Sequence, residues 1–215
     1  MDGSKTIQIE GWNERYHSIH GALQEAKYVY IDAGLKKFLE CKPKQNALSI
    51  LEIGLGTGLN ALLTALESLK ISQEIYYHGI EAYPVLADEL QALEYDLLTG
   101  SDPTIFRQIH SCSWEETKKI LPHFSIVKRR AFFSDIDEAN AFDVIYFDAF
   151  GPRVQPHLWI ESIFKKMYKA LRPNGLLVTY CAKGSVRRCM QAVGFEVERL
   201  AGPPGKREML RAIKL

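Results

Sequence analysis

The stretch that decides the fold is ALSILEIGLGTGLN, residues 47–60. It begins as an apolar run of the length of a buried strand and continues as a loop with glycine at every second position. The glycines at Gly54, Gly56 and Gly58 let the backbone approach a ligand closely at a helix N-terminus, whose free N–H groups favour an anion. The stretch therefore predicts a strand, a ligand-binding loop and a helix in succession.

The register of the glycines separates two classes of cofactor. A dinucleotide-binding fingerprint would place its third glycine at position 59, where this chain has Leu59. An acidic residue two positions before the first of three alternating glycines, here Glu52, is the usual opening of an S-adenosylmethionine-binding methyltransferase. We therefore expect S-adenosyl-L-methionine as the cofactor, bound by Glu52, the three glycines and Asn60, with the methionine carboxylate as the anion.

The rest of the chain alternates strand and helix signals, the pattern of a mostly parallel sheet with helices on both faces. The two strand-like segments at the C-terminus are typical of the end of a methyltransferase sheet, where the last strand is inserted antiparallel. The prediction is a Rossmann-like class I methyltransferase fold: an α/β, mostly parallel seven-stranded sheet with an antiparallel C-terminal strand. We expect a single domain over 1–215, with residues 1–46 as an extension that covers the site and 47–215 as the core. Strands are expected at 47–53, 75–80, 124–133, 142–147, 176–180, 195–200 and 208–213, and helices from 59, over 84–95, over 160–171 and over 186–193.

Composition narrows the class of protein further. The 215 residues are 47% hydrophobic and 25% charged, as in ordinary α/β proteins, and no apolar run approaches membrane-spanning length. The four cysteines show no paired metal spacing, and the N-terminus has no signal-peptide core. We therefore expect a cytoplasmic protein with reduced thiols, no metal and no membrane contact.

Charge is unevenly distributed along the chain. Residues 1–164 carry 15 Lys and Arg against 23 Asp and Glu, whereas residues 165–215 carry 12 against 3. A basic end on an otherwise acidic chain indicates a polyanion site, and a solvated lysine-rich surface is the alternative. The candidates for phosphate contacts are Lys183, Arg187, Arg188, Lys206 and Arg207.

Three acidic residues follow predicted strands, at the sheet edge where ligands of open α/β folds bind. Glu81 is placed to accept hydrogen bonds from both ribose hydroxyls of the cofactor. Asp135 is a weaker candidate for the adenine amino group, because Ser134 and Asp135 would equally suit a helix cap. Asp148 lies where the methyl acceptor meets the cofactor, and it could orient an acceptor amine and take up its proton, or merely organise the loop.

Assembled, these elements resemble the methyltransferase module of the tRNA 5-methylaminomethyl-2-thiouridine biosynthesis protein, the MnmC/MnmD family. The likeness runs essentially end to end, and the chain departs from it at Ala149 and Gly151, whose order is reversed, and at Ser185. It rests on Asp2-Gly3-Ser4 with Thr6, Glu14 to Ser18, Gly21-Ala22 with Glu25, the glycine loop, Glu81, Asp148 to Pro152, Pro156 to Trp159, Val186 to Arg188, Gly194-Phe195 and Gly205 to Leu210.

The resemblance implies methyl transfer to the exocyclic amine of 5-aminomethyl-(2-thio)uridine at the tRNA wobble position. It implies tRNA, through its anticodon loop, as the partner, and a separate enzyme that supplies the aminomethyl precursor, because the chain is too short to hold the family's flavin-dependent oxidase module. Asp148 is then the catalytic candidate, and Tyr16, His17, Phe150 and Pro152 are substrate candidates. Two alternatives stay open: a methyltransferase or aminopropyltransferase acting on a small amine, and a non-catalytic RNA-binding module.

Overall fold

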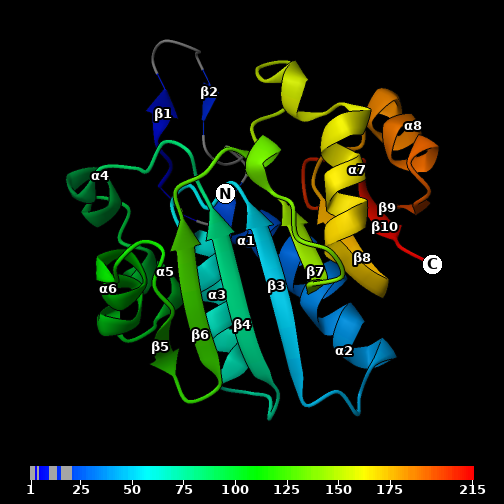
Figure 1. Ribbon diagram of the computed structural model, residues 1–215. Helices are drawn as coiled ribbons and strands as arrows, with labels where there is room; N and C mark the ends of the chain where they lie inside the picture. Colours follow the sequence, from blue (N-terminus) through cyan, green and yellow to red (C-terminus); the bar gives the residue numbers. More distant parts are fainter. Residues whose placement is uncertain (1–2, 4, 10–13, 16–20) are drawn as a thin grey trace.

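An eight-stranded sheet forms the centre of the computed structural model, which describes Gly3 and residues 5–9, 14–15 and 21–215 (Figure 1). Five neighbouring strands are parallel, and the strands that flank them on either side are antiparallel to their neighbours. In sheet order the strands are β5 (Lys118–Leu121), β6 (Phe124–Arg129), β4 (Glu74–Ile80), β3 (Ala47–Ile53), β7 (Phe142–Phe147), β8 (Leu171–Thr179), β10 (Glu208–Ile213) and β9 (Glu196–Ala201).

The expected α/β class is confirmed, with β10 as the antiparallel strand between β8 and β9. The sheet has eight strands rather than the expected seven, because residues 118–121 pair antiparallel with β6 as an additional edge strand. This edge strand begins with two exposed lysines, Lys118 and Lys119, so it lacks the apolar run by which the central strands are found. The central strand β7 is buried at all six positions, as expected of a strand covered on both faces.

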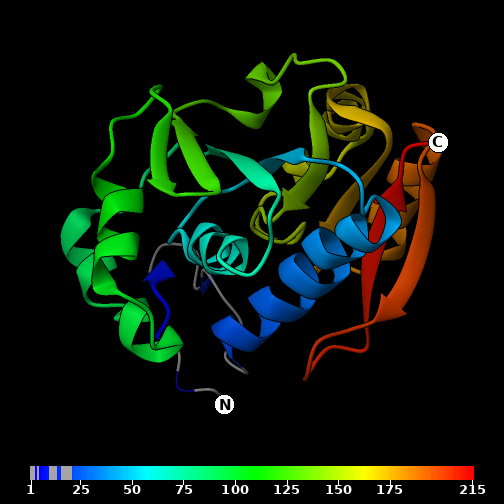
Figure 2. The same cartoon turned by 90° about the horizontal axis from the view of Figure 1, so that it is seen from below.

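Helices cover both faces of the sheet, and Figure 2 shows the resulting layers. One hydrophobic core lies between the sheet and α3 (Leu59–Ser68), α6 (Pro103–Ser111) and the N-terminal helix. A second core lies on the opposite face, under α7 (Glu161–Ala170) and α8 (Gly184–Ala192). This arrangement leaves the C-terminal ends of the parallel strands uncovered by the two helical layers, and the short strands β1 (Gln8–Ile9) and β2 (Glu14–Arg15) lie above that end in Figure 1.

The N-terminal helix is irregular where it crosses the sheet. It begins as α1 (Ala22–Ala26), widens into a ten-residue π-helical segment, η2 (Lys27–Lys36), and ends as α2 (Lys37–Cys41). Gly34 brings η2 close to the sheet, because a Cβ there would lie 3.0 Å from Val178 Cγ2 and 3.2 Å from Tyr146 Cε1. Segments of π-helix are rare and occur frequently at functional sites.

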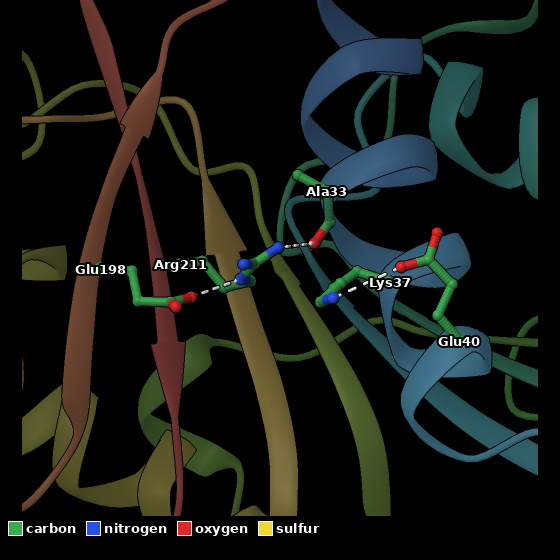
Figure 3. Close-up of polar contacts among 5 residues, drawn as sticks. All are labelled: Ala33, Lys37, Glu40, Glu198 and Arg211. Atoms are coloured by element: carbon green, nitrogen blue, oxygen red, sulfur yellow. Dashed lines mark hydrogen bonds and ion pairs between the residues drawn. The ribbon is translucent and has the colours of Figure 1, made fainter.

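Arg211 of β10 connects this helix to the edge of the sheet (Figure 3). Its Nε donates to Glu198 Oε2 of β9 at 2.6 Å, and its NH1 group donates to the Ala33 carbonyl oxygen of η2 at 3.4 Å. Figure 3 also shows the Lys37–Glu40 ion pair one turn further along the helix, at 3.4 Å. Arg211 therefore serves the fold, as do other basic residues of the C-terminal segment, such as Arg172 and Lys214.

Several expected elements differ from the structure. The strand expected at 176–180 is longer and begins at Leu171, directly after α7. The helix expected over 84–95 is two short helices, α4 (Ala87–Gln91) and α5 (Tyr95–Thr99), because Glu94 adopts a left-handed conformation with φ 51° and interrupts the helical path. The strand expected over 124–133 ends at Arg129, and the chain then turns into the 3₁₀ segment η3 (Phe133–Asp135). In the described ranges, no helix combines the length and the apolar character that crossing a membrane requires.

Candidate active site

A cavity of about 820 Å³ opens where the central strands end. Residues that follow β3, β4, β6 and β7 line it, together with the loop before α7 and the first turns of α7. This is the position at which open α/β sheets bind ligands, and the volume suits a molecule of nucleoside size. Its lining is Gly54, Gly56, Glu81, Ala82, Tyr83, Phe132, Phe133, Ser134, Asp148, Ala149, Phe150, Gly151, Gln155, His157, Leu158, Ile160, Ser162, Ile163 and Tyr180.

The glycine loop borders this cavity. Gly54 has φ 87°, and a Cβ there would lie 2.9 Å from the Asp148 carbonyl oxygen, so only glycine lets β3 turn this close to the end of β7. Helix α3 follows at Leu59, with its N-terminus at the loop. The loop and the helix N-terminus thus lie together at the cavity, as the predicted anion site requires.

Glu81 holds the loop from the neighbouring strand. Its carboxylate accepts hydrogen bonds from Gly56 N at 3.0 Å and Tyr83 N at 2.9 Å, one to each oxygen. Burial raises the pKa of Glu81, and the backbone hydrogen bonds from Tyr83 and Gly56 oppose that rise. Each oxygen keeps a further lone pair for a donor from a ligand in the cavity, such as a ribose hydroxyl.

Asp148 lies at the end of β7 and is held by two donors on different helices. Tyr30 Oη of η2 donates to its Oδ1 at 2.6 Å, and Asn60 Nδ2 of α3 donates to its Oδ2 at 2.8 Å. Burial raises the pKa of Asp148 to about 6, and the bonds from Tyr30 and Asn60 limit that rise. At neutral pH the group is a carboxylate whose proton affinity is far higher than that of an exposed aspartate.

Glu52 lies behind this site and does not line the cavity. Its side chain is completely buried, and it accepts hydrogen bonds from Tyr77 Oη and Asn60 Nδ2, both at 2.8 Å. Burial raises the pKa of Glu52 well above its ordinary value. The Asn60 amide thus bridges Glu52 and Asp148, while its Oδ1 is buried without a hydrogen-bond partner among the described residues. Glu52 therefore fixes Asn60, and through it Asp148.

Hydrogen bonds from Trp159 and Tyr180 fix the loop that follows Asp148. Trp159 is buried, and its Nε1 donates to the Phe150 carbonyl oxygen at 2.8 Å. Tyr180, which follows β8, donates from its hydroxyl to the Ala149 carbonyl oxygen at 2.9 Å. A Cβ on Gly151 would meet only the Tyr180 hydroxyl, at an ordinary 3.5 Å, so this loop accommodates a small side chain at either position. The spacing from Asp148 to Trp159 thus has a structural reason.

The structure separates the basic candidates. Lys183, Arg188 and Arg207 are exposed, on or beside α8 and in the turn between β9 and β10. Arg187 is half-buried, and its Nε has no hydrogen-bond partner within the described ranges. Lys206 instead forms an ion pair with Glu25 at 2.6 Å and is not an independent surface charge.

The remaining candidates lie in different places. Asp135 is exposed, and its Oδ2 accepts from Phe132 N at 3.0 Å, which is a capping role, although its neighbour Ser134 lines the cavity. Gly58 faces His110 rather than the cavity lining, and Pro152 is half-buried outside that lining. Tyr16 and His17 lie outside the described residues.

Sequence reasoning missed Tyr30 and Tyr180. Neither belongs to a motif with a chemical signature, and both reach the site only because η2 and β8 pack beside β7. The pattern Gly21-Ala22 with Glu25 marks the start of the helix that carries Tyr30, but it gives no reason to single out this tyrosine.

These residues fit S-adenosyl-L-methionine. The glycine loop offers an anion site, Glu81 offers acceptors for ribose hydroxyls, and Phe133, Leu158 and Ile163 give the cavity apolar walls. Asn60 contributes through its amide nitrogen, which holds Asp148 in the cavity wall, and does not itself line the cavity. The described residues contain no group of three or more His, Cys, Asp or Glu that could hold a metal ion.

The fold and the site define an S-adenosylmethionine-dependent methyltransferase, and comparison with known families agrees. The family model described as "S-adenosyl-L-methionine-dependent methyltransferase" matches residues 104–215, more than half of the chain. The chain belongs to this family.

Among curated proteins, the chain is similar to the tRNA 5-methylaminomethyl-2-thiouridine biosynthesis bifunctional protein MnmC of several bacteria. The protein of Actinobacillus pleuropneumoniae serotype 5b is 26% identical over 229 residues, covering 98% of this chain and 34% of the relative. That of Idiomarina loihiensis is 27% identical over 214 residues, covering 93% and 35%. The chain thus spans about a third of the length of these curated relatives.

Solved structures support the fold. MnmC2 from Aquifex aeolicus superposes with a TM-score of 0.73 at 23% identity, covering 98% of this chain and 67% of that one. Spermidine synthase from Thermotoga maritima superposes with a TM-score of 0.56 at 17% identity, covering 94% and 64%. At these identities the likeness shows the fold alone and does not identify the methyl acceptor.

Proposed function

We propose that the protein transfers a methyl group from S-adenosyl-L-methionine to the exocyclic amine of 5-aminomethyl-(2-thio)uridine at the wobble position of tRNA. The observation that carries the proposal is Asp148, a partly buried carboxylate in the cavity wall beside the glycine loop, on the side that we assign to the acceptor. Membership of the methyltransferase family and the names of the curated relatives support the same chemistry.

The acceptor chemistry needs a neutral, aligned amine. S-Adenosyl-L-methionine supplies an electrophilic sulfonium methyl, so that the new N–C bond forms as the C–S bond breaks and its electron pair stays on sulfur. In our mechanism the Asp148 carboxylate attracts the incoming ammonium group, accepts its N–H hydrogen bond and takes up the proton that nitrogen must lose. The raised pKa of Asp148, about 6, makes this carboxylate a better base than an exposed aspartate.

Alignment is the second requirement. Tyr30 and Asn60 fix both oxygens of Asp148, so the carboxylate has little freedom to rotate away from an amine. The Phe150 and Tyr180 side chains border the same part of the cavity and would exclude water from it. Tyr16 and His17 remain candidates for covering the acceptor from the N-terminal segment.

On the RNA side, the wobble base must leave the anticodon stack to reach the cavity. We assign the phosphate contacts to Lys183, Arg187, Arg188 and Arg207, whose charges are not consumed by an ion pair that the structure gives. These contacts would make binding strongly salt-dependent, whereas binding of a small uncharged or cationic amine would not be.

The decisive experiment incubates the protein with methyl-labelled S-adenosyl-L-methionine and tRNA from cells that lack this modification, followed by digestion and nucleoside analysis. Label in 5-methylaminomethyl-(2-thio)uridine supports the proposal, and label in any other nucleoside refutes the assigned acceptor. Transfer to a small amine but not to tRNA would favour the methyltransferase or aminopropyltransferase alternative. Failure to bind S-adenosyl-L-methionine in calorimetry would favour a non-catalytic RNA-binding module.

The role of Asp148 has its own test in the same assay. An Asp148→Asn enzyme should bind S-adenosyl-L-methionine normally and lose at least about 100-fold in turnover, in line with the loss of a positioned general base. Full turnover by this variant would refute the role of Asp148 while leaving the acceptor assignment intact.

A further inference from the structure

Glu25 and Lys206, which have no part in the mechanism above, lie together beside the acceptor side of the cavity. Glu25 belongs to α1, and Lys206 belongs to the turn between β9 and β10. Lys206 Nζ lies 2.6 Å from Glu25 Oε2, and the two side chains are only 29% and 14% exposed. This is a half-buried ion pair between distant segments, unlike the exposed pairs that contribute little to proteins.

The pair is in contact with the wall of the cavity. Lys206 Nζ lies 4.1 Å from the centre of the Tyr180 ring, a favourable cation–π distance. Tyr180 lines the cavity, and its hydroxyl holds the Ala149 carbonyl oxygen, directly after Asp148. A chain of contacts therefore runs from Glu25 through Lys206 and Tyr180 to the loop that carries Asp148.

The charges of the pair act on the same carboxyl in opposite directions. Glu25 raises the pKa of Asp148, and Lys206 lowers it. The other groups that face Asp148 are Tyr30 from η2 and Asn60 from α3. From behind, Glu52 of β3 also interacts with it electrostatically. Without Lys206, Glu25 would be a second uncompensated carboxylate on the acceptor side, and like charges raise each other's proton affinity.

We propose that Glu25 and Lys206 are positioning residues for methyl transfer: their ion pair holds Tyr180 against the Asp148 loop and cancels its own charge, so that the acceptor side presents one net negative charge to one cationic amine. The proposal rests on the proposed role of Asp148 as the group that receives the amine. It also reassigns Lys206 from the phosphate contacts to the acceptor side. A pair that only ties the turn to the helix would leave the charge state of Asp148 unaffected.

The test measures the titration of Asp148 without any substrate. Protein labelled with ¹³C at the aspartate carboxyl carbon gives a signal for Asp148, assigned by its loss in Asp148→Asn, and its pKa is read from the shift with pH. Lys206→Met should raise this pKa by about half a unit or more, and Glu25→Gln should lower it by a similar amount. The double variant should return close to the wild-type value, because the two effects cancel.

Two further variants separate charge from folding. Arg199→Met removes an ion pair in the same hairpin, 3.5 Å from Glu208, and should leave the Asp148 titration unchanged. Lys206→Arg keeps the charge and should also leave the titration unchanged. If Lys206→Met folds poorly, the lowered Asp148 pKa expected of Glu25→Gln still tests the proposal. Equal shifts in both single variants, or none, would overturn the proposal.

The tRNA assay with the same variants distinguishes the ion-pair proposal from the proposed role of Asp148. Opposite shifts of the Asp148 pKa that are mirrored in the pH profile of kcat/KM support both the ion-pair proposal and the role of Asp148. Opposite shifts without any change in that profile would uphold the charge balance and refute the role of Asp148. Lys206→Met should change kcat more than the KM for tRNA, whereas loss of a phosphate contact would mainly raise KM.

Discussion

Replacing Asp148 by asparagine should change the pH dependence of the protein's stability, so that the variant gains relative to the wild type as pH rises. Folding raises the pKa of this carboxyl from 3.8 to about 6, so the folded state prefers the protonated form. The stability that this preference contributes is fully present below pH 3.8 and is lost as pH rises towards 6. A shift of about two units corresponds to about 3 kcal/mol, of which about 2 kcal/mol should be lost between pH 4.5 and 7.5.

The assay is urea unfolding of the wild type and Asp148→Asn at several pH values across that range. The asparagine variant lacks the titration, so the difference in unfolding free energy should grow by about 2 kcal/mol from pH 4.5 to pH 7.5. The change in hydrogen bonding to Tyr30 and Asn60 adds only an offset that is the same at each pH. Curves that stay parallel across the range would show that folding does not raise this pKa.

A second variant should strengthen the pH dependence of stability instead of removing it. Tyr30→Phe removes the 2.6 Å hydrogen bond to Asp148 Oδ1, a bond that lowers the pKa of Asp148. A hydrogen bond to a charged group contributes about 1.5–3 kcal/mol, so its loss should raise the pKa further by about one to two units. The fall in stability with rising pH should therefore become steeper than in the wild type and extend beyond pH 6.

Three further predictions concern the loop, the cofactor and the fold. Gly54→Ala should weaken S-adenosyl-L-methionine binding at least about 10-fold in calorimetry and destabilise the protein by about 1–3 kcal/mol, because its Cβ would lie 2.9 Å from the Asp148 carbonyl oxygen. Gly100→Ala is the matched control, since Gly100 also has positive φ but has nothing within 4 Å, and it should cost about 1 kcal/mol with no loss of binding. Glu81→Gln should weaken binding of S-adenosyl-L-methionine about 10- to 100-fold with a small change in Tm, and unchanged binding would refute the ribose assignment. Arg211→Met should lower the unfolding free energy by about 1–2 kcal/mol in urea without affecting cofactor binding, because it removes hydrogen bonds to β9 and η2 only.

The central sheet could be predicted from sequence because its strands are buried on both faces. β3 and β7 are mostly apolar, and the sequence predicts their bounds to the residue. The sequence does not predict β5, because this edge strand begins with two exposed lysines and lacks an apolar run. The prediction of one helix over 84–95 is wrong because Glu94 adopts a left-handed conformation and divides an apparently continuous helical pattern. Nothing in the local sequence marks that residue.

The site divides along the same line. The sequence predicts that Gly54, Glu81 and Asp148 lie together, because each follows a parallel strand and these strands end at one edge of the sheet; all three line the cavity. Tyr30 could not be found, since its distance to Asp148 depends on how a π-helical segment packs across the sheet. The pairing of Lys206 with Glu25 is likewise tertiary, and a count of basic residues cannot separate a paired lysine from a free one.

The features that weaken this fold gather at the edge where the cofactor is expected. At neutral pH two buried carboxyl groups cost stability: Glu52, which is completely buried, and Asp148, whose raised pKa means that folding favours its protonated form. Both accept a hydrogen bond from Asn60. The fold tolerates this cost because two hydrophobic cores stabilise it on either side of the sheet. A ligand that binds the folded protein at the anion site should stabilise it. Binding of S-adenosyl-L-methionine should therefore raise Tm in the wild type, and the rise should be smaller in Gly54→Ala than in Gly100→Ala.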